Sequence, residues 1–307
     1  MKKCIIAGLL LLAAGAGLVW AMGRGPAAAE PLHVLLIPAD GGTESGTLAD
    51  YQPIFNAIAR TMGMTFDLKV AQSYGAVVEA MCTGGADIAF VGPVTYLQAR
   101  DRGCAELLAV AVKDKQSVYY AGIFARKASP IHTLADLRGK RVAFGDVNST
   151  SSFVFPLTML MDAGIDPVKD LAAVRMTGSH ASSLAALLQG QVDAAALSFE
   201  SYDKAVREKV PGVLDVRVVA RSEPIPYPPL VMKRRLPAKT REALKTAFQN
   251  IAKAPGITPE MIRGYGGAQV DGYDSAFPAA RFNPAAQKMA AVSDALKGEI
   301  LKKSAER

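Results

Sequence analysis

Residues 80–89, AMCTGGADIA, return later in the chain as residues 186–195, ALLQGQVDAA. The same offset pairs three further residues with counterparts: Ser73 with Ser179, Tyr74 with His180, and Tyr96 with Tyr202. Each copy has the pattern of a short helix that ends at a glycine, then a buried strand, a turn and a new helix. The small apolar run after each aspartate suits a strand covered on both faces, as in a parallel sheet. We therefore expect an α/β protein built on two copies of one unit.

The residues around each copy extend this order. An apolar strand at 32–38 leads through a Gly-rich loop to a helix at 51–62, and a strand at 141–144 leads through residues 145–148 to a helix that runs through Met161. We expect two lobes, each with a doubly wound sheet. Ligands of such sheets bind beyond the carboxyl ends of the strands.

The lobe borders are marked by two extended segments, 119–126 and 216–225, which predict a two-strand hinge. The first lobe is expected to comprise 30–122 plus 226–307, and the second lobe 123–225. Helical stretches at 238–253 and 285–302 form the tail, which we expect to pack on the first lobe.

The first 29 residues have the pattern of a secretory signal peptide. Lys2 and Lys3 precede an apolar run from Ile5 to Trp20, and small residues follow up to Ala29. An uncleaved membrane anchor is the alternative. No later apolar stretch reaches the roughly 20 residues that a spanning helix needs. From the signal-peptide pattern we expect a secreted, periplasmic protein.

The charge of the chain argues against nucleic-acid binding. The net charge is +7, from 35 basic and 28 acidic residues. Removal of the leader takes away Lys2, Lys3 and Arg24 and no acid, which leaves a mild excess of base. No run of Lys and Arg with interleaved aromatic residues is present, so no nucleic-acid partner is expected.

A run of hydroxyl side chains is the strongest candidate for a binding site. Ser149, Thr150, Ser151 and Ser152 stand between a strand and a helix, where their hydroxyls adjoin unpaired backbone N–H groups. An ordinary helix cap needs one hydroxyl, and four indicate an anion site made of neutral donors. His180 opens the repeat helix of the second lobe, where it can donate to the same oxyanion.

Other candidates are individually weaker. Thr95 and Tyr96 stand in the matching turn of the first lobe, and Tyr51 lies near the start of the first helix. Glu200 follows the second repeat strand. There a carboxylate can accept a hydrogen bond from a protonated oxygen or an amine of the ligand. Each of these residues is equally consistent with packing or with a surface position. The sequence contains no catalytic motif, so we expect a binding protein rather than an enzyme, and no cofactor.

Two cysteines remain after the leader, Cys82 and Cys104. Their spacing matches no zinc pattern, and the three histidines are scattered, so no metal site is expected. A disulfide is the simplest interpretation in an oxidising compartment.

Several motifs together resemble a known family. They are residues 144–153 (FGDVNSTSSF), Gly178-Ser179-His180, residues 92–96 (GPVTY) and residues 222–226 (SEPIP). In this order they are similar to the phosphate/phosphite/phosphonate-binding family, the periplasmic solute-binding proteins of ABC importers, which have the two-lobed type II fold. The resemblance runs from about residue 32 to residue 251. It implies delivery of a small oxyanion to an ABC permease in the inner membrane.

The resemblance also implies roles for the candidate residues. Ser149, Thr150, Ser151 and His180 would hold the oxyanion. Tyr96 and Tyr51 would close on it from the first lobe, and Glu200 would lie near a phosphonate substituent.

The sequence departs from the family pattern at two places. Ser152 stands where the family usually has glycine, and residues 225–229 (IPYPP) lack the acid that the family tends to place after its Ile-Pro turn. A related branch resembles periplasmic arsenite sensors that use cysteine and signal to a membrane histidine kinase, so Cys82 and Cys104 keep a sensor role open. The sequence leaves phosphate, phosphite, a phosphonate and arsenite as alternative ligands.

Overall fold

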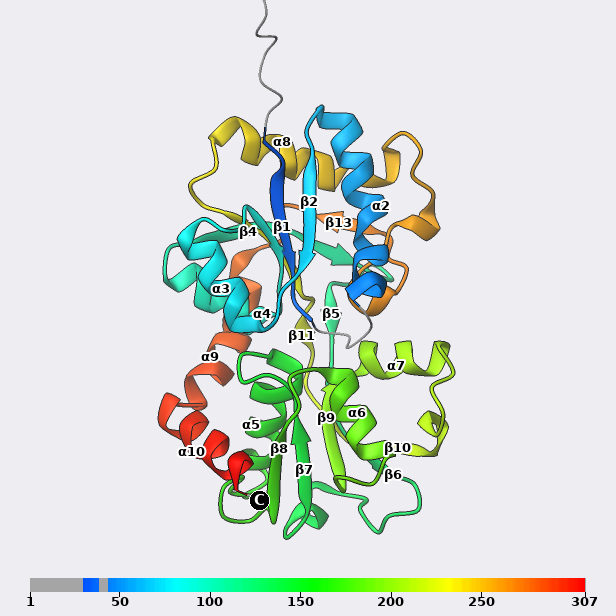
Figure 1. The fold of residues 1–307 in the computed structure, drawn as a ribbon, viewed down its shortest axis with the longest axis vertical. Coiled ribbons are helices and arrows are strands. Elements are labelled where there is room, and N and C mark those ends of the chain that lie inside the picture. The colour runs from blue at the N-terminus through cyan, green and yellow to red at the C-terminus, as the bar shows by residue number, and fades with distance from the viewer. Residues whose placement is uncertain (1–29, 39–43, 307) are drawn as a thin grey trace, which may run out of the picture. The chain divides into compact units, whose positions relative to one another are not determined.

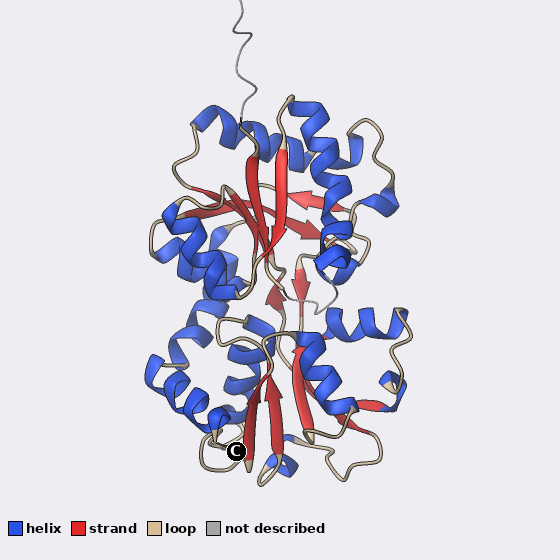
Figure 2. Ribbon diagram, in the orientation of Figure 1, coloured by secondary structure: helices blue, strands red, loops and turns tan. Residues whose placement is uncertain are grey.

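The first of two large sheets has six strands in the order β13-β4-β12-β3-β1-β2 (Figures 1 and 2). The computed structural model describes residues 30–38 and 44–306, so the expected signal peptide lies outside the described residues. In this sheet β1 is parallel to β2 and β3, whereas β12 and β13 run antiparallel to their neighbours. The strands are β1 (Leu32–Leu36), β2 (Phe66–Val70), β3 (Ile88–Phe90), β4 (Ala105–Val112), β12 (Pro229–Lys233) and β13 (Gly272–Asp274).

The second sheet has five strands in the order β10-β6-β9-β7-β8. Here β7 is parallel to β8 and β9, and β6 is antiparallel to β9 and β10. The strands are β6 (Ala121–Arg126), β7 (Arg141–Phe144), β8 (Ala173–Met176), β9 (Ala194–Ser198) and β10 (Val216–Arg221). We call each large sheet with its helices a lobe. This arrangement confirms the expected α/β class with two doubly wound sheets.

Helices flank both sheets. The first lobe contains α2 (Glu44–Met62), α3 (Tyr74–Thr83), α4 (Pro93–Asp101) and α8 (Ala238–Gln249). The second contains α5 (Phe155–Asp162), α6 (His180–Leu188) and α7 (Phe199–Arg207). Both lobes belong to one compact unit that begins at Leu32. No helix in the described part of the chain is long and apolar enough to cross a bilayer.

The connection between the lobes is a short antiparallel ladder of β5 (Val118–Tyr119) and β11 (Ile225–Pro226). The two crossing segments that the sequence predicts are therefore present. Most of their length, however, belongs to β6 and β10 of the second sheet. The hinge itself is confined to residues next to the ladder.

The internal repeat forms the same unit twice, as α3-β3-α4 and as α6-β9-α7. Gly84 and Gly190 both adopt positive φ, 92° and 71°, just after the first helix of each copy. The shared aspartates have a structural role. Asp87 Oδ2 accepts from the backbone N–H of His33 in β1 (3.0 Å), and Asp193 Oδ2 accepts from that of Arg141 in β7 (2.9 Å). Each aspartate thus ties its repeat to the first strand of its own lobe.

The last two helices differ from expectation. Helix α8 packs on the first lobe, against α2, β4 and β13, but α10 (Asp294–Ala305) packs on β8 of the second lobe (Figure 1). The intervening α9 (Asn283–Ala291) contacts both α4 and α5. Strand β8 is an edge strand, and the Ser304 hydroxyl accepts a hydrogen bond from the backbone N–H of Met176 at that edge (3.0 Å). Covering an unpaired edge is the physical reason for this placement.

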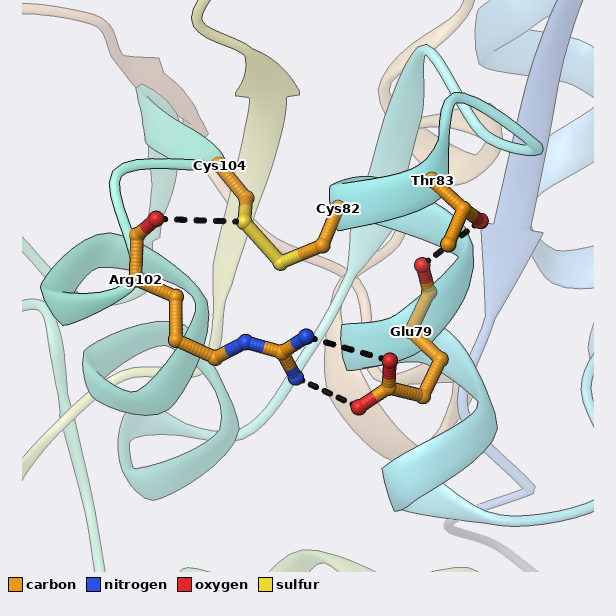
Figure 3. Close-up of a disulfide and its surroundings, with 5 residues drawn as sticks. All are labelled: Glu79, Cys82, Thr83, Arg102 and Cys104. Carbon is orange, nitrogen blue, oxygen red and sulfur yellow. Dashed lines mark hydrogen bonds and ion pairs between the residues drawn. A yellow bond between two sulfur atoms is a disulfide. The ribbon is translucent and has the colours of Figure 1, made fainter.

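Cys82 and Cys104 form a disulfide, with their Cα atoms 4.8 Å apart (Figure 3). The bond joins the last turn of α3 to the residue before β4, and Arg102 Nη2 pairs with Glu79 Oε2 beside it (3.1 Å). The disulfide interpretation is therefore confirmed. Because the two sulfurs are bonded to each other, they are not available as thiolate ligands for arsenite.

We predict that the double variant Cys82→Ser, Cys104→Ser loses about 3 kcal/mol of unfolding free energy, as expected when a loop of this length is no longer closed in the unfolded chain. The two cysteines are 22 residues apart in sequence. Urea denaturation of the variant and of the oxidised wild type measures the difference. Oxyanion affinity should be unchanged, and a variant that folds normally but binds no oxyanion would contradict a purely structural bridge.

Candidate anion-binding site

Several helix starts converge on one small cavity between the lobes. The first lobe and the hinge contribute Ile37, Tyr74, Gly92, Tyr119, Pro228 and Tyr265, and the second lobe contributes Ser149, Thr150, Ser151 and His180. Tyr74 and His180 are the first residues of α3 and α6, Gly92 precedes α4, and Ser149 precedes the helical turn before α5. Only about 10 Å³ of the cavity admits the centre of a water molecule, about the room that one water needs.

The convergence follows from the sheet topology. Parallel strands end at the same edge, and the helix that follows each strand begins there with backbone N–H groups that have no partner within the helix. These N–H groups and the helix dipoles favour an anion. None of the described residues that line the cavity has a carboxylate, ammonium or guanidinium group.

The Ser/Thr run lies where the sequence analysis places it. It follows β7, and its first turn, Thr150–Val154, is wound as a π-helix before α5 begins. Ser149, Thr150, Ser151 and Ser152 are all buried. The Ser149 hydroxyl caps this turn by accepting from the backbone N–H of Ser152 (3.2 Å). The run thus contains an ordinary cap and, in addition, two hydroxyl residues that line the cavity.

Groups of the second lobe cap two helices of the first lobe. Thr150 Oγ1 accepts from the backbone N–H of Val94 in α4 (2.9 Å), at a helix start whose own cap residue, Gly92, has no side chain. Asp146 Oδ2 lies 3.4 Å from the backbone N of Tyr74, the first residue of α3, and accepts its hydrogen bond. Burial raises the pKa of Asp146 above its ordinary value, against the effect of the backbone N–H groups of Asn148 and Tyr74, which donate to its carboxylate. These contacts join the lobes directly across the cavity.

His180 is a neutral donor, not an imidazolium. Its Nδ1 accepts a hydrogen bond from the backbone N–H of Ser198 (3.0 Å), so the proton of the neutral ring is on Nε2. Burial lowers the pKa of His180 to about 3. From the sequence we expect His180 to donate to an oxyanion. The structure is consistent with donation from Nε2 of a neutral ring.

Three tyrosines that are not among the candidates from the sequence also line the cavity: Tyr74, Tyr119 and Tyr265. Tyr119 comes from the hinge. Burial raises the pKa of its phenol, and hydrogen bonds with Ser151 and Thr150 act against this rise. Its hydroxyl therefore stays protonated at neutral pH. Tyr265 bonds to the Ser198 hydroxyl of the second lobe (3.0 Å). Of the three, only Tyr74 has a signal in the sequence, since the repeat pairs it with His180.

The remaining candidates lie outside the residues that line the cavity. Tyr96 is one turn into α4 and packs against Phe282, with ring centroids 5.0 Å apart. Tyr51 is buried against Phe90, at 4.9 Å. The Thr95 hydroxyl donates to the backbone carbonyl of Asn148 (3.1 Å), which is a contact between lobes.

Glu200 also lies outside the cavity lining, in the first turn of α7. It is close enough to Tyr119 for its charge to raise the pKa of that phenol. The carboxylate is thus near the site but is not among the residues that line the cavity.

A second set of contacts closes the lobes beside α7. Lys204 Nζ of α7 lies 3.6 Å from Asp50 Oδ2 of α2, and both side chains are almost fully buried. Arg263 Nη1 pairs with the other oxygen of Asp50 (3.1 Å), and Arg207 Nη2 donates to the carbonyl of Gly266 (2.6 Å). Removal of one partner from a buried ion pair leaves an uncompensated charge, which is costly, so loss of Asp50 or Lys204 would destabilise the closed arrangement.

Larger hollows among the described residues contain none of the Ser/Thr run, and no metal cluster is found among these residues. Among residues 30–38 and 44–306, no group of three or more His, Cys, Asp and Glu side chains could hold a metal ion. A groove of about 630 Å³ between α2 and α8 is larger, but it contains none of the Ser/Thr run or of the repeat. Its walls are mainly apolar side chains with lysines at the margin.

The chain is similar to proteins of a known family. Residues 42–280 match the family described as the periplasmic substrate-binding protein of phosphonate ABC transporters. The phosphate-import protein PhnD of Mycolicibacterium smegmatis is 28% identical over 244 residues, which are 75% of each chain. The phosphonates-binding periplasmic protein of Escherichia coli is 27% identical over 67% of this chain and 62% of that protein.

Solved structures give the same fold. The binding protein component of an ABC phosphonate transporter from Pseudomonas aeruginosa superposes with a TM-score of 0.75. The superposition covers 89% of this chain and 96% of that one, at 21% identity.

We predict that the neutral state of buried His180 makes the fold sensitive to acid. Because the folded-state pKa lies below the unfolded value of 6.5, the unfolded state binds the additional proton as the pH falls. The stabilisation is complete above pH 6.5 and is lost at about 1.4 kcal/mol per pH unit below it. Between pH 6.5 and 5 we expect a loss of about 2 kcal/mol from this residue.

The measurement is the urea unfolding free energy of wild type and His180→Asn between pH 8 and 5. Asparagine offers the Ser198 N–H an acceptor but does not titrate, so its profile should be flatter. The exposed His132 provides the control, and His132→Asn should retain the wild-type slope. Parallel profiles for wild type and His180→Asn would show that His180 does not resist protonation in the folded state.

Proposed function

The chain belongs to the family of periplasmic substrate-binding proteins of phosphonate ABC transporters, and on that premise we propose that its inter-lobe cavity captures a small phosphorus oxyanion of the phosphate, phosphite or phosphonate class. The protein then delivers this ligand to an ABC permease in the inner membrane. The observation that supports the proposal most strongly is the meeting of helix starts from both lobes at one cavity lined by neutral donors.

Neutral donors suit a protein that must release its ligand. Hydroxyls, the Nε2–H of His180 and backbone N–H groups bind an oxyanion through hydrogen bonds and helix dipoles. A carboxylate in the wall would repel a fully ionised ligand, and the described wall has none. A lysine or arginine would form a stronger, longer-lived ion pair. The wall therefore favours specific but reversible binding.

Binding requires the lobes to separate. The cavity has room for about one water, whereas a phosphorus oxyanion has at least four heavy atoms. We propose that the lobes open about the β5–β11 ladder, which breaks the contacts of Thr150 with Val94 and of Lys204 with Asp50. The oxyanion then replaces Thr150 and Asp146 as the partner of some helix N–H groups, and the lobes close on it.

Location and partner follow from the family. Its members are periplasmic binding proteins of ABC importers. We propose that residues 1–29 direct export of this chain and that the closed, loaded form docks on the permease. We assign it no enzymatic activity, because the cavity wall combines no nucleophile with a general base: the buried His180 is tied at Nδ1 by a backbone N–H.

We predict that Thr150→Val weakens oxyanion binding by about 1.5–3 kcal/mol, the usual contribution of a hydrogen bond to a charged group. Valine preserves the shape of threonine and removes its hydroxyl. Calorimetric titration with phosphate, phosphite, methylphosphonate and 2-aminoethylphosphonate, with sulfate for comparison, measures the affinity and identifies the ligand.

The control is Thr158→Val, in α5, which follows directly after the turn that contains Thr150. Thr158 is also buried, and its hydroxyl donates to the carbonyl of Phe155 (2.9 Å), away from the cavity. This variant should lose stability but not affinity. A wild-type protein that binds none of the phosphorus oxyanions would overturn the proposed function. If Thr150→Val binds as tightly as wild type, the ligand is held elsewhere.

A further inference from the structure

The hydroxyl of Ser149 has both of its acceptor positions occupied by one neighbour. Ser149 Oγ accepts from the backbone N–H of Ser152 (3.2 Å) and from the hydroxyl of Ser152 (2.7 Å). A hydroxyl has one proton to donate and two lone pairs. With both lone pairs used, donation is the only further hydrogen bond that Ser149 can make, and Ser149 lines the cavity.

We propose that Ser152 is a positioning residue of the anion site, which fixes Ser149 as an obligate donor to the bound oxyanion. The proposal rests on the proposed function of the cavity. Ser152 itself does not line the cavity and is fully buried. Its effect on the ligand is therefore transmitted through the hydroxyl of Ser149.

Gly145 provides the space for this arrangement. A Cβ atom on Gly145 would lie 2.1 Å from Ser152 Oγ and 2.9 Å from Ser152 Cβ. The backbone N–H of Gly145 also donates to the carbonyl of Ser152 (3.0 Å). The Ser152 side chain thus fills a slot that exists only because residue 145 has no side chain. The serine at position 152 and the glycine at position 145 form one structural unit.

The start of α6 has the same pair of hydroxyls with the bond in the opposite direction. Ser179 caps that helix by accepting from the backbone N–H of Ser182 (3.1 Å), just as Ser149 accepts from Ser152. There, however, the cap residue is the donor: Ser179 Oγ donates to Ser182 Oγ (2.9 Å). The proton of Ser179 is thus used within the turn. Neither Ser179 nor Ser182 lines the cavity.

The reversed direction has a consequence for the ligand. A hydroxyl that can only donate accepts no hydrogen bond from a protonated oxygen of the ligand. Ser149 therefore recognises an unprotonated oxygen. Loss of the Ser152 hydroxyl returns one lone pair to Ser149 and allows its O–H to rotate. The donor must then be ordered when the anion binds, at the cost typical of one immobilised side chain.

A double-mutant cycle tests the proposal. The four proteins are wild type, Ser149→Ala, Ser152→Ala and the double variant, each titrated calorimetrically with phosphate, phosphite and methylphosphonate. We expect Ser149→Ala to weaken binding by roughly 10- to 150-fold and Ser152→Ala by roughly 3- to 10-fold. Because Ser152 acts through Ser149, the double variant should match Ser149→Ala within about twofold.

The contrary results are distinct. If Ser152→Ala binds like wild type, or if its effect adds fully to that of Ser149→Ala, Ser152 does not act through Ser149 and the proposal is overturned. If wild type binds none of the three anions, the proposed function fails first, and the inference fails with it. A wild type that binds normally confines any failure to Ser152.

Ser182→Ala is the matched control, since it breaks the corresponding hydroxyl pair at the start of α6, where neither Ser179 nor Ser182 lines the cavity. It should change affinity by less than about twofold, and a loss equal to that of Ser152→Ala would overturn the proposal. Thermal unfolding confirms that each variant folds. Ser152→Gly removes the same hydroxyl and replaces Ser152→Ala in the cycle if the alanine variant does not fold.

Discussion

The structure depends on one constraint, the backbone N–H groups at the starts of helices, which have no partner within their own helix. Parallel strands bring the starts of α3, α4 and α6, and of the turn before α5, to one place. Buried N–H groups need partners. In the closed structure some of these partners come from the opposite lobe: Thr150 for Val94, and Asp146 for Tyr74. The same groups that join the lobes are those that an oxyanion can satisfy.

This exchange links binding to motion. Contacts between the lobes, including the buried pair of Lys204 with Asp50, are made only when the lobes are closed. An oxyanion adds its own hydrogen bonds only when both lobes reach it, so it shifts the population toward the closed form. The open fraction of the free protein then limits the apparent affinity, because the ligand can enter only that form. Affinity and closure are therefore coupled through the residues that line the cavity, while the contacts beside α7 act on closure alone.

Much of the fold, and four of the ten residues that line the cavity, can be predicted from the sequence. The repeat identifies both lobes because its glycines and aspartates have the same local role twice, and the Ser/Thr run and His180 lie at the cavity as the pattern predicts. Tyr119 and Tyr265 are not predictable in this way, since they come from the hinge and from an irregular segment without periodicity. Tyr74, the counterpart of His180, begins its helix and lines the cavity, whereas Tyr96 lies a turn inside α4 and does not. The neutral state of His180 and the packing of α10 on β8 depend on burial and on an exposed edge, which only the three-dimensional arrangement supplies.

The most direct test of the account is a crystal structure of the protein grown with the phosphorus oxyanion that it binds most tightly. We expect the anion between the lobes, within hydrogen-bonding distance of the hydroxyls of Ser149–Ser151 and of His180 Nε2, in contact with the helix starts of both lobes. An anion found in the groove between α2 and α8, or bound to one lobe with the helix starts unoccupied, would contradict it.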